Sequence, residues 1–158
     1  MADVIIRKLA ESDAEAAAGV FYDAVHFGTA SHYNDAQGKA WAPAPPEGTG
    51  WRDRLMTQHG FVAELDGAII GFMTLRPDGY IDFAYVAPGH IGQGIAKQLY
   101  DRILAQARDI GVTRLTSDAS YPARQFFEQQ GWSVIKEQTV TRNGVSMTNF
   151  AMEKYLAE

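Results

Sequence analysis

The chain has 158 residues, 46% of them hydrophobic, with 14 lysines and arginines against 19 aspartates and glutamates and no cysteine. This length suits one domain around a single core, so residues 1–158 are expected to form one unit. Without cysteine there is no disulfide, no thiolate zinc site and no cysteine nucleophile. The formal net charge of -5 argues against a nucleic-acid partner and suits a cationic or neutral small molecule.

The start of the chain has only a short apolar stretch, residues 4–6, followed at once by Arg7 and Lys8. It therefore lacks the apolar region of a secretory signal peptide. Nothing further along approaches the roughly 18 to 20 apolar residues of a membrane span. These features predict a cytoplasmic protein with no membrane partner. The sequence is compatible with either a monomer or a homodimer.

The first third of the chain predicts a strand followed by helices. Residues 4–9 have the apolar character of a strand, and Ser12 with Glu15 three positions later forms a capping box that begins an alanine-rich helix. Between residues 28 and 60 aromatic residues mix with prolines, which suits either a packing cluster or a ligand wall. The helices predicted in this segment end near Trp41 and span residues 51–58.

Tight-turn signals divide the rest of the chain. Asp66-Gly67 and Asn143-Gly144 each predict a type I′ turn between antiparallel strands, and a long amphipathic helix ends at Gly111. The other predicted elements are strands at 61–65, 68–75, 80–86 and 112–116, a helix at 122–130, a strand at 132–141 and a last strand through 152. The order βααβββαβαββ predicts an α+β fold, a layered α/β arrangement. In it, a mixed, mostly antiparallel twisted sheet of about seven strands is flanked by about four helices.

Residues 85–97 run from the end of a strand into the longest helix and are rich in glycine. Gly89, Gly92 and Gly94 allow the backbone to approach a ligand closely, and the unpaired N–H groups of the first helical turn favour an anion. A phosphate or pyrophosphate is the expected ligand. The dinucleotide-binding and ATP-binding glycine patterns are both absent. A glycine-rich turn without a ligand is the alternative.

This loop resembles the acetyl-CoA pyrophosphate loop of the GNAT superfamily of N-acetyltransferases, whose pattern is Val-x-Pro-x-x-Arg/Gln-x-x-Gly-x-Gly/Ala. Ile91 stands where the family usually has Arg or Gln. A second match, residues 120–132, resembles the family's Asn-x-x-Ala-x-x-Phe-Tyr-Glu-x-x-Gly-Phe helix, and the order of elements is also that of the family. The matching residues of the loop are Val86, Pro88, Gly94 and Ala96. Shorter stretches that look like a bacterial small-molecule branch are 40–43, 79–82, 118–120 and 148–152.

The resemblance implies that acetyl-CoA is the cosubstrate. In that family the strand before the loop splays from its parallel neighbour, and the pantetheine arm lies in the gap. For Lys97 a solvated helix position is an equal alternative to a charge on the pyrophosphate. The residues expected to bind the cosubstrate are Ala84, Tyr85 and Val86 along the arm, Gly92, Gln93, Gly94, Ile95, Ala96 and Lys97 at the pyrophosphate, and Ser120 and Phe127 beside the arm.

Direct transfer from a thioester to an amine needs a neutral amine, a polarised carbonyl and a proton donor for the thiolate. The usual donor of the family is a tyrosine at the position of Phe127, so this chain lacks it. Tyr121 and Tyr85 have suitable chemistry, with plain packing as the alternative. A third possibility is a thiolate that leaves without help, because its pKa is near 8.5. The absence of cysteine excludes a cysteine-acyl intermediate and favours direct transfer.

Asp82 is the preferred proton acceptor, because it is a carboxylate in an otherwise apolar strand. By the two-residue period of a strand it shares a face with Tyr80 and Ala84. A surface-facing aspartate is the alternative. Asp118 is the second candidate, with helix capping as its alternative.

The four histidines lack the spacing of a metal site, so no metal is expected. The sequence predicts an acetyl-CoA-dependent N-acetyltransferase that acts directly on a primary amine of a small molecule. The alternative is a CoA-binding sensor or partner module without catalysis, suggested by Phe127 and Ile91. Acetylation of proteins is disfavoured, because the proline-rich segment should narrow the pocket. The residues expected to line the acceptor pocket, with ordinary packing as their alternative, are His32, Tyr33, Trp41 and Tyr80.

Overall fold

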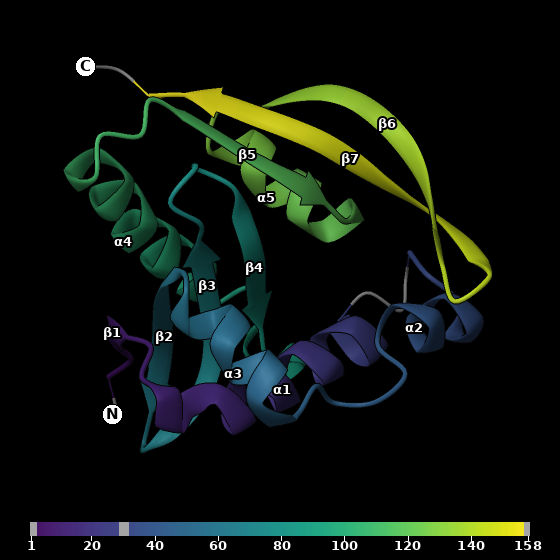
Figure 1. The fold of residues 1–158 in the computed structure, drawn as a ribbon, viewed down its shortest axis with the longest axis horizontal. Helices are drawn as coiled ribbons and strands as arrows, with labels where there is room; N and C mark the ends of the chain where they lie inside the picture. Colours follow the sequence, from purple (N-terminus) through teal and green to yellow (C-terminus); the bar gives the residue numbers. More distant parts are fainter. Residues whose placement is uncertain (1–2, 29–31, 157–158) are drawn as a thin grey trace.

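Two antiparallel sheets and five α-helices make up the computed structural model, which describes residues 3–28 and 32–156 (Figure 1). The four-stranded sheet has the order β1-β2-β3-β4, and the three-stranded sheet has the order β5-β7-β6. The strands are β1 (Ile5–Lys8), β2 (His59–Leu65), β3 (Ala68–Leu75), β4 (Ile81–Val86), β5 (Arg114–Ala119), β6 (Ser133–Arg142) and β7 (Val145–Tyr155). The helices are α1 (Ala14–Asp23), α2 (Asp35–Trp41), α3 (Gly48–Met56), α4 (Ile95–Asp109) and α5 (Tyr121–Gln129). Within these ranges no helix is both long and apolar enough to cross a membrane.

This architecture confirms the predicted mixed fold with seven mostly antiparallel strands. Both helices expected in the proline-rich segment form, as α2 and α3, so the described chain has five α-helices rather than about four. The strands are divided between two sheets. Among the described residues, one parallel bridge connects the two sheets, between Tyr80, just before β4, and Thr116 of β5.

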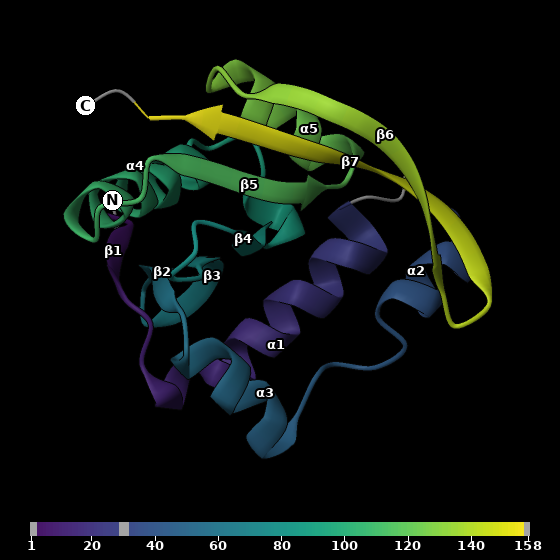
Figure 2. The same ribbon diagram turned by 45° about the horizontal axis from the view of Figure 1, so that its top comes forward.

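Helices cover both faces of the four-stranded sheet (Figure 2). On one face Phe61, Ala63 and Met73 belong to a buried cluster with side chains of α4, and on the other Val62 and Phe72 pack with α1 and α3. The two sets alternate along β2 and β3 because successive side chains of a strand point to opposite faces. The sheet thereby fixes the start of α4 next to the end of β4.

The predicted capping box at the start of α1 is wrong. Ser12 lies inside a 3-10 turn, Glu11–Asp13, and caps nothing in the described chain. The carboxylate of Asp13 accepts the N–H of Ala10 at 2.8 Å and two hydrogen bonds from the Arg7 guanidinium, at 2.7 and 2.9 Å. The first turn is therefore anchored to β1 by an ion pair.

Replacing this carboxylate, Asp13→Asn, should lower the free energy of unfolding by about 1.5 to 3 kcal/mol at pH 7, since charge-assisted hydrogen bonds of a buried side chain are lost. The hydrogen bonds from Arg7 hold the pKa of the Asp13 carboxyl below its usual value. The folded state therefore binds this proton less readily than the unfolded state. Its stabilisation is complete above about pH 5 and is lost as the pH falls through the lowered pKa. Urea unfolding at pH 7 and pH 3 measures the effect, and an equal difference at both pH values would contradict it.

The β6–β7 hairpin is long and extends past β5 to reach α2 (Figure 2). Its turn has positive φ at both central residues, 49° at Asn143 and 78° at Gly144, as a type I′ turn requires. The Asn143 amide donates to the carbonyl of Ala40 at 2.8 Å, and the Gln37 amide donates to the carbonyl of Ser146 at 3.1 Å. The hairpin tip and α2 therefore hold each other in place.

Candidate functional site

The two sheets separate where β4 and β5 begin to diverge. The Thr116 N–H donates to the Gly79 carbonyl at 3.1 Å, and the Ser117 hydroxyl donates to the Ile81 carbonyl at 2.9 Å. Beyond this point β4 pairs only with β3, and β5 pairs only with β7, within the described chain. The facing edges of both strands keep backbone groups that an extended ligand can bind.

A β-bulge at Asp82 shapes the acidic end of this gap. Leu75 pairs with Ile81 and Thr74 pairs with Phe83, so Asp82 has no partner on β3. The extra residue interrupts the two-residue alternation of β4. The expectation that Asp82 shares a face with Ala84 is therefore wrong: the two residues line different cavities.

The first cavity, of about 410 Å³, lies between the start of α4, the end of β4 and α5. Gly94 precedes α4 with a φ of 78°, and a Cβ atom added there would meet no heavy atom within 4 Å. The first helical hydrogen bond is donated by Gln98 to Gly94, so the N–H groups of the three residues between them are not paired within the helix. Such amides, with the positive end of the helix dipole, are suited to bind an anion.

Nearly every residue expected to bind the cosubstrate lines this first cavity. Gln93 does not, and its side-chain oxygen lies 3.0 Å from Nδ1 of His90, which does line the cavity. Lys97 lines the cavity and also forms an ion pair with Asp101, which reduces its free charge. The expected residues that line it are Ala84, Tyr85, Val86, Gly92, Gly94, Ile95, Ala96, Lys97, Ser120 and Phe127.

A second cavity, of about 340 Å³, lies between β4, the helices α1 to α3 and the β6–β7 hairpin. Asp82, Tyr33, Trp41 and Tyr80 line it, and seven of its lining residues are aromatic: Phe21, Tyr33, Trp41, Trp51, Tyr80, Phe83 and Tyr85. Tyr85 and Ser120 line both cavities. The two cavities therefore meet at the gap between β4 and β5.

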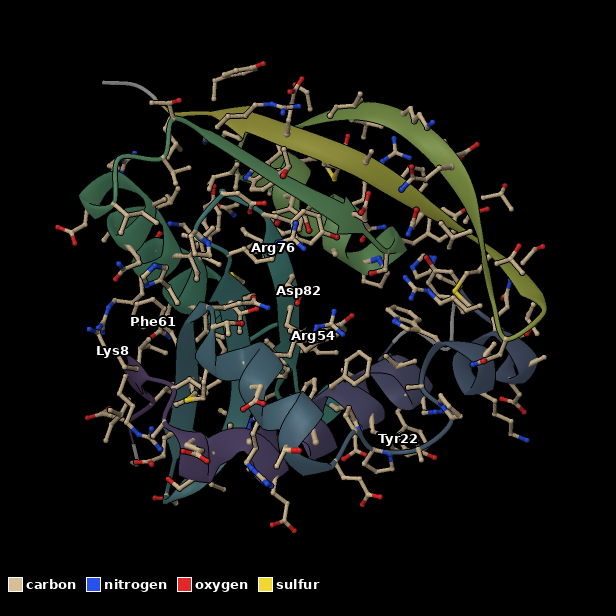
Figure 3. The ribbon with its side chains drawn as sticks, in the orientation of Figure 1. Lys8, Tyr22, Arg54, Phe61, Arg76 and Asp82 are labelled. Atoms are coloured by element: carbon tan, nitrogen blue, oxygen red, sulfur yellow. The ribbon has the colours of Figure 1, made fainter. Side chains whose placement is uncertain are left out.

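Asp82 is held by a guanidinium group. Arg54 of α3 donates two hydrogen bonds to its carboxylate, at 2.8 and 2.9 Å, and the Gln58 amide donates a third at 2.7 Å. Figure 3 shows Arg54 and Asp82 pointing toward each other across the start of β4. The Arg54 guanidinium also lies 4.6 Å from the centre of the Phe83 ring. Sequence reasoning missed Arg54, because helix spacing alone does not show which strand residue it faces.

Asp118, at the end of β5, has only neutral hydrogen-bond donors in the described chain. The Tyr80 hydroxyl donates to one oxygen at 2.9 Å, and the Gln138 amide donates to the other at 2.9 Å. Burial and this hydrogen bond raise the pKa of Tyr80 to about 12. The capping role considered for Asp118 is filled by Ser120 instead, whose hydroxyl accepts the N–H of Ala123 at 3.4 Å.

The two candidate proton donors have different surroundings. Burial raises the pKa of the Tyr85 hydroxyl, which makes no hydrogen bond in the described chain and lines both cavities. Tyr121 lines neither cavity, because its ring packs against Phe150 at 5.0 Å between centroids and stacks on His32 at 5.3 Å. His32 likewise lies outside both cavities.

The β6–β7 hairpin adds cavity residues that sequence reasoning missed. Gln138 and Arg142 each lie two positions from Val140 on one face of β6, and Asn149 of β7 pairs with Gln138. The carboxamide oxygen of Asn149 is buried and has no hydrogen-bond partner among the residues that the structure describes. The alternation of polar and apolar residues could have shown which hairpin side chains share a face. Nothing in the sequence indicates that the hairpin bends toward α2. Among the described residues, no group of histidine, aspartate and glutamate side chains is placed to hold a metal ion.

Comparison with known proteins gives one family. Residues 29–154 match the acetyltransferase (GNAT) domain. The uncharacterized N-acetyltransferase YafP of Escherichia coli (strain K12) is 30% identical over 152 residues, covering 96% of each chain. The crystal structure of a GCN5-related N-acetyltransferase from Rhodopseudomonas palustris has a TM-score of 0.90 and 33% identity, covering 99% of this chain and 98% of that one. The PaiA N-acetyltransferase of Thermoplasma acidophilum, solved in complex with coenzyme A, has a TM-score of 0.75 and 18% identity, covering 98% of this chain and 99% of that one. The chain therefore belongs to the GNAT family of N-acetyltransferases.

Proposed function

We propose that this chain transfers the acetyl group of acetyl-CoA directly to a primary amine of a small molecule while both substrates are bound. The observation that carries this proposal is the pair of cavities that share Tyr85 and Ser120 at the gap between β4 and β5. Two substrates held from the two cavities would meet there. Proximity of this kind supplies a large part of the rate enhancement in group transfer.

The first cavity suits coenzyme A. Its pyrophosphate would lie on the N–H groups at the start of α4, where the left-handed Gly94 leaves room for the phosphates. The pantetheine arm would run along the free edge of β4 at Ala84 and Val86, both of which line the cavity. The PaiA structure, solved with coenzyme A, supports this choice of ligand through the shared fold.

The second cavity suits a small acceptor. Its volume of about 340 Å³ falls within the range of small-molecule sites. The β6–β7 hairpin and α2, which are hydrogen-bonded to each other, form two of its walls, so an extended protein segment has little room. Its aromatic side chains can pack against the carbon atoms of an acceptor, while its polar side chains can bind the amine.

The transfer needs one proton acceptor and one donor. Asp82 already binds Arg54 through both oxygens, so we assign it to holding the guanidinium, and we assign Asp118 with Tyr80 to accepting the proton of the amine. As the amine nitrogen bonds to the acetyl carbon, the carbon–sulfur bond breaks and its electron pair goes to sulfur. The Tyr85 hydroxyl then donates a proton to the thiolate and regains one from solvent, to which Asp118 releases the proton that it took from the amine. Tyr85 would thus take the place of the usual tyrosine donor, whose position is occupied by Phe127 in this chain.

Release of free CoA from acetyl-CoA tests the proposal. A thiol reagent follows the release across a panel of small primary amines, and mass spectrometry identifies the acetylated product. We expect release that depends on the amine, with one acetylated amine for each CoA. A protein that binds CoA by calorimetry but releases none above the amine-free background with any amine would instead be a CoA-binding module.

A further inference from the structure

Arg142 stands out among the residues that line the acceptor cavity. It lies at the end of β6, is exposed, and has no ion pair or hydrogen bond within the described chain. Arg54, which lines the same cavity, is neutralised by Asp82 at 2.8 Å. The cavity therefore contains one guanidinium group whose charge and donors are free for a ligand. A guanidinium binds carboxylate or phosphate oxygens in a two-pronged geometry.

The charge of Arg142 acts at the place where transfer would occur. Burial raises the pKa of the Tyr85 hydroxyl, and the positive charge of Arg142 partly opposes this rise. Tyr85 lines both cavities, so Arg142 is within electrostatic reach of the point where they meet. An anionic group held by Arg142 would therefore lie close to the reacting amine rather than at a distant subsite.

The opposite end of the hairpin face offers acceptors for N–H groups. Asn149 lines the cavity, and its carboxamide oxygen is buried and has no hydrogen-bond partner among the described residues, an unfavourable state that a ligand N–H reaching it would relieve. Asn149 pairs across the strands with Gln138, whose amide donates to Asp118. The Asn149 carboxamide oxygen and the Asp118 carboxylate, which can both accept hydrogen bonds, therefore lie at this end of the cavity. Gln138 and Arg142 are four residues apart, which is about 13 Å along a strand. The long side chain of Arg142 can shorten the distance between its guanidinium group and these oxygens.

We propose, on the basis of the proposed function, that the acceptor carries an anionic group as well as its amine, as an amino acid or a short amino-phosphonate does. Arg142 binds the anionic group, while Asn149 and Asp118 accept the N–H groups of the amine. The same three side chains set the distance between the two ends of the acceptor. Simple monoamines fill the aromatic part of the cavity but leave Arg142 without a partner.

Matched acceptors and an Arg142→Gln variant test this inference. Amino acids and the corresponding amino-phosphonates carry an anionic group, which their neutral carboxamides lack. The carboxamides also have the less basic amine, so the difference in basicity works against the expected preference. We expect kcat/KM to be about 10- to 100-fold higher for the carboxylate or the phosphonate than for the carboxamide, the range for a charge-assisted hydrogen bond. Whichever anion gives the higher value identifies the class. Equal values for all three would overturn the inference.

In Arg142→Gln the preference for the anionic acceptor should disappear, while kcat/KM for the carboxamide changes less than about threefold, and Arg142→Lys should restore part of it. Arg108→Gln is the matched control, because Arg108 lies in the last turn of α4 and lines neither cavity. Equal losses with all three acceptors would mean that Arg142 serves the structure or acts on the Tyr85 hydroxyl instead of binding the acceptor. That result, too, would overturn the inference.

Binding separates this inference from the proposed function. Calorimetry of the CoA-loaded protein should show the amino acid or phosphonate binding more tightly than the carboxamide, and Arg142→Gln should remove the difference. If that holds while no amine releases CoA, the acceptor assignment stands and the transferase proposal fails. If CoA is released but neither rate nor binding depends on Arg142, the transferase proposal stands and this inference fails.

Discussion

Gly94→Asp should raise the dissociation constant for CoA by at least about 100-fold, because the new carboxylate would occupy the anion site at the start of α4 and repel the pyrophosphate. Gly94 has a φ of 78°, so any side chain there also strains the backbone. No neighbouring atom lies within 4 Å of the added Cβ, so the loss would come from charge and strain rather than from a clash in the fold. Calorimetric titration with CoA measures the change.

Two variants separate these causes. Gly94→Ala has the strain without the charge and should lose much less affinity. Gly111→Asp places the same charge at a glycine with a φ of 81° and open space around it, but at the other end of the same helix, so it should leave CoA affinity unchanged. Thermal unfolding of all three shows whether the fold is kept. CoA affinity like that of the wild type in Gly94→Asp would refute the assignment of the loop.

Asp118→Asn should lower kcat by about 100-fold with little change in CoA affinity, because the variant keeps the side chain's size but cannot take the proton of the amine. The Tyr80 hydroxyl and the Gln138 amide, which now donate to this carboxylate, would keep one acceptor oxygen between them. Steady-state kinetics with the best amine of the panel, together with CoA titration, give both quantities.

Comparison with Asp82→Asn and Tyr85→Phe makes this result specific. Asp82→Asn releases Arg54 and should act mainly on KM for the acceptor. Tyr85→Phe removes the proposed donor but keeps the ring, whose centroid lies 5.0 Å from that of Phe21. We expect a decrease of only about tenfold in kcat, since a thiolate is a tolerable leaving group. A larger loss of kcat in Asp82→Asn than in Asp118→Asn, strongest at low pH, would identify Asp82 as the proton acceptor.

Sequence patterns served well where short-range chemistry determines structure. The Asp66-Gly67 turn adopts the positive φ values that its residues favour, 51° and 82°. The glycines before α4 marked the loop, because both the turn and the room for a ligand depend on residues close together in the chain. For the same reason the expected cosubstrate residues, with the exception of Gln93, line one cavity.

The acceptor side was harder to predict because it depends on contacts between distant segments. The bulge at Asp82 arises from how β4 pairs with β3, and it changes which side chains share a face. The ion pair of Asp82 with Arg54 joins residues 28 positions apart. Arg142 and Asn149 line the cavity because the β6–β7 hairpin reaches α2. Tyr121 lies outside it because its ring packs against Phe150 and Tyr33.

The division of the walls between the two cavities also bears on how such a protein changes over time. Among the described lining residues, only Tyr85 and Ser120 serve both cavities; the donor side otherwise draws mainly on residues 84–97 and α5, and the acceptor side mainly on residues 33–54 and the β6–β7 hairpin. Mutations in α2 or the hairpin can therefore alter which amine fits while the acetyl donor is held as before. Substrate range can drift, or be redesigned, one segment at a time without loss of the cosubstrate.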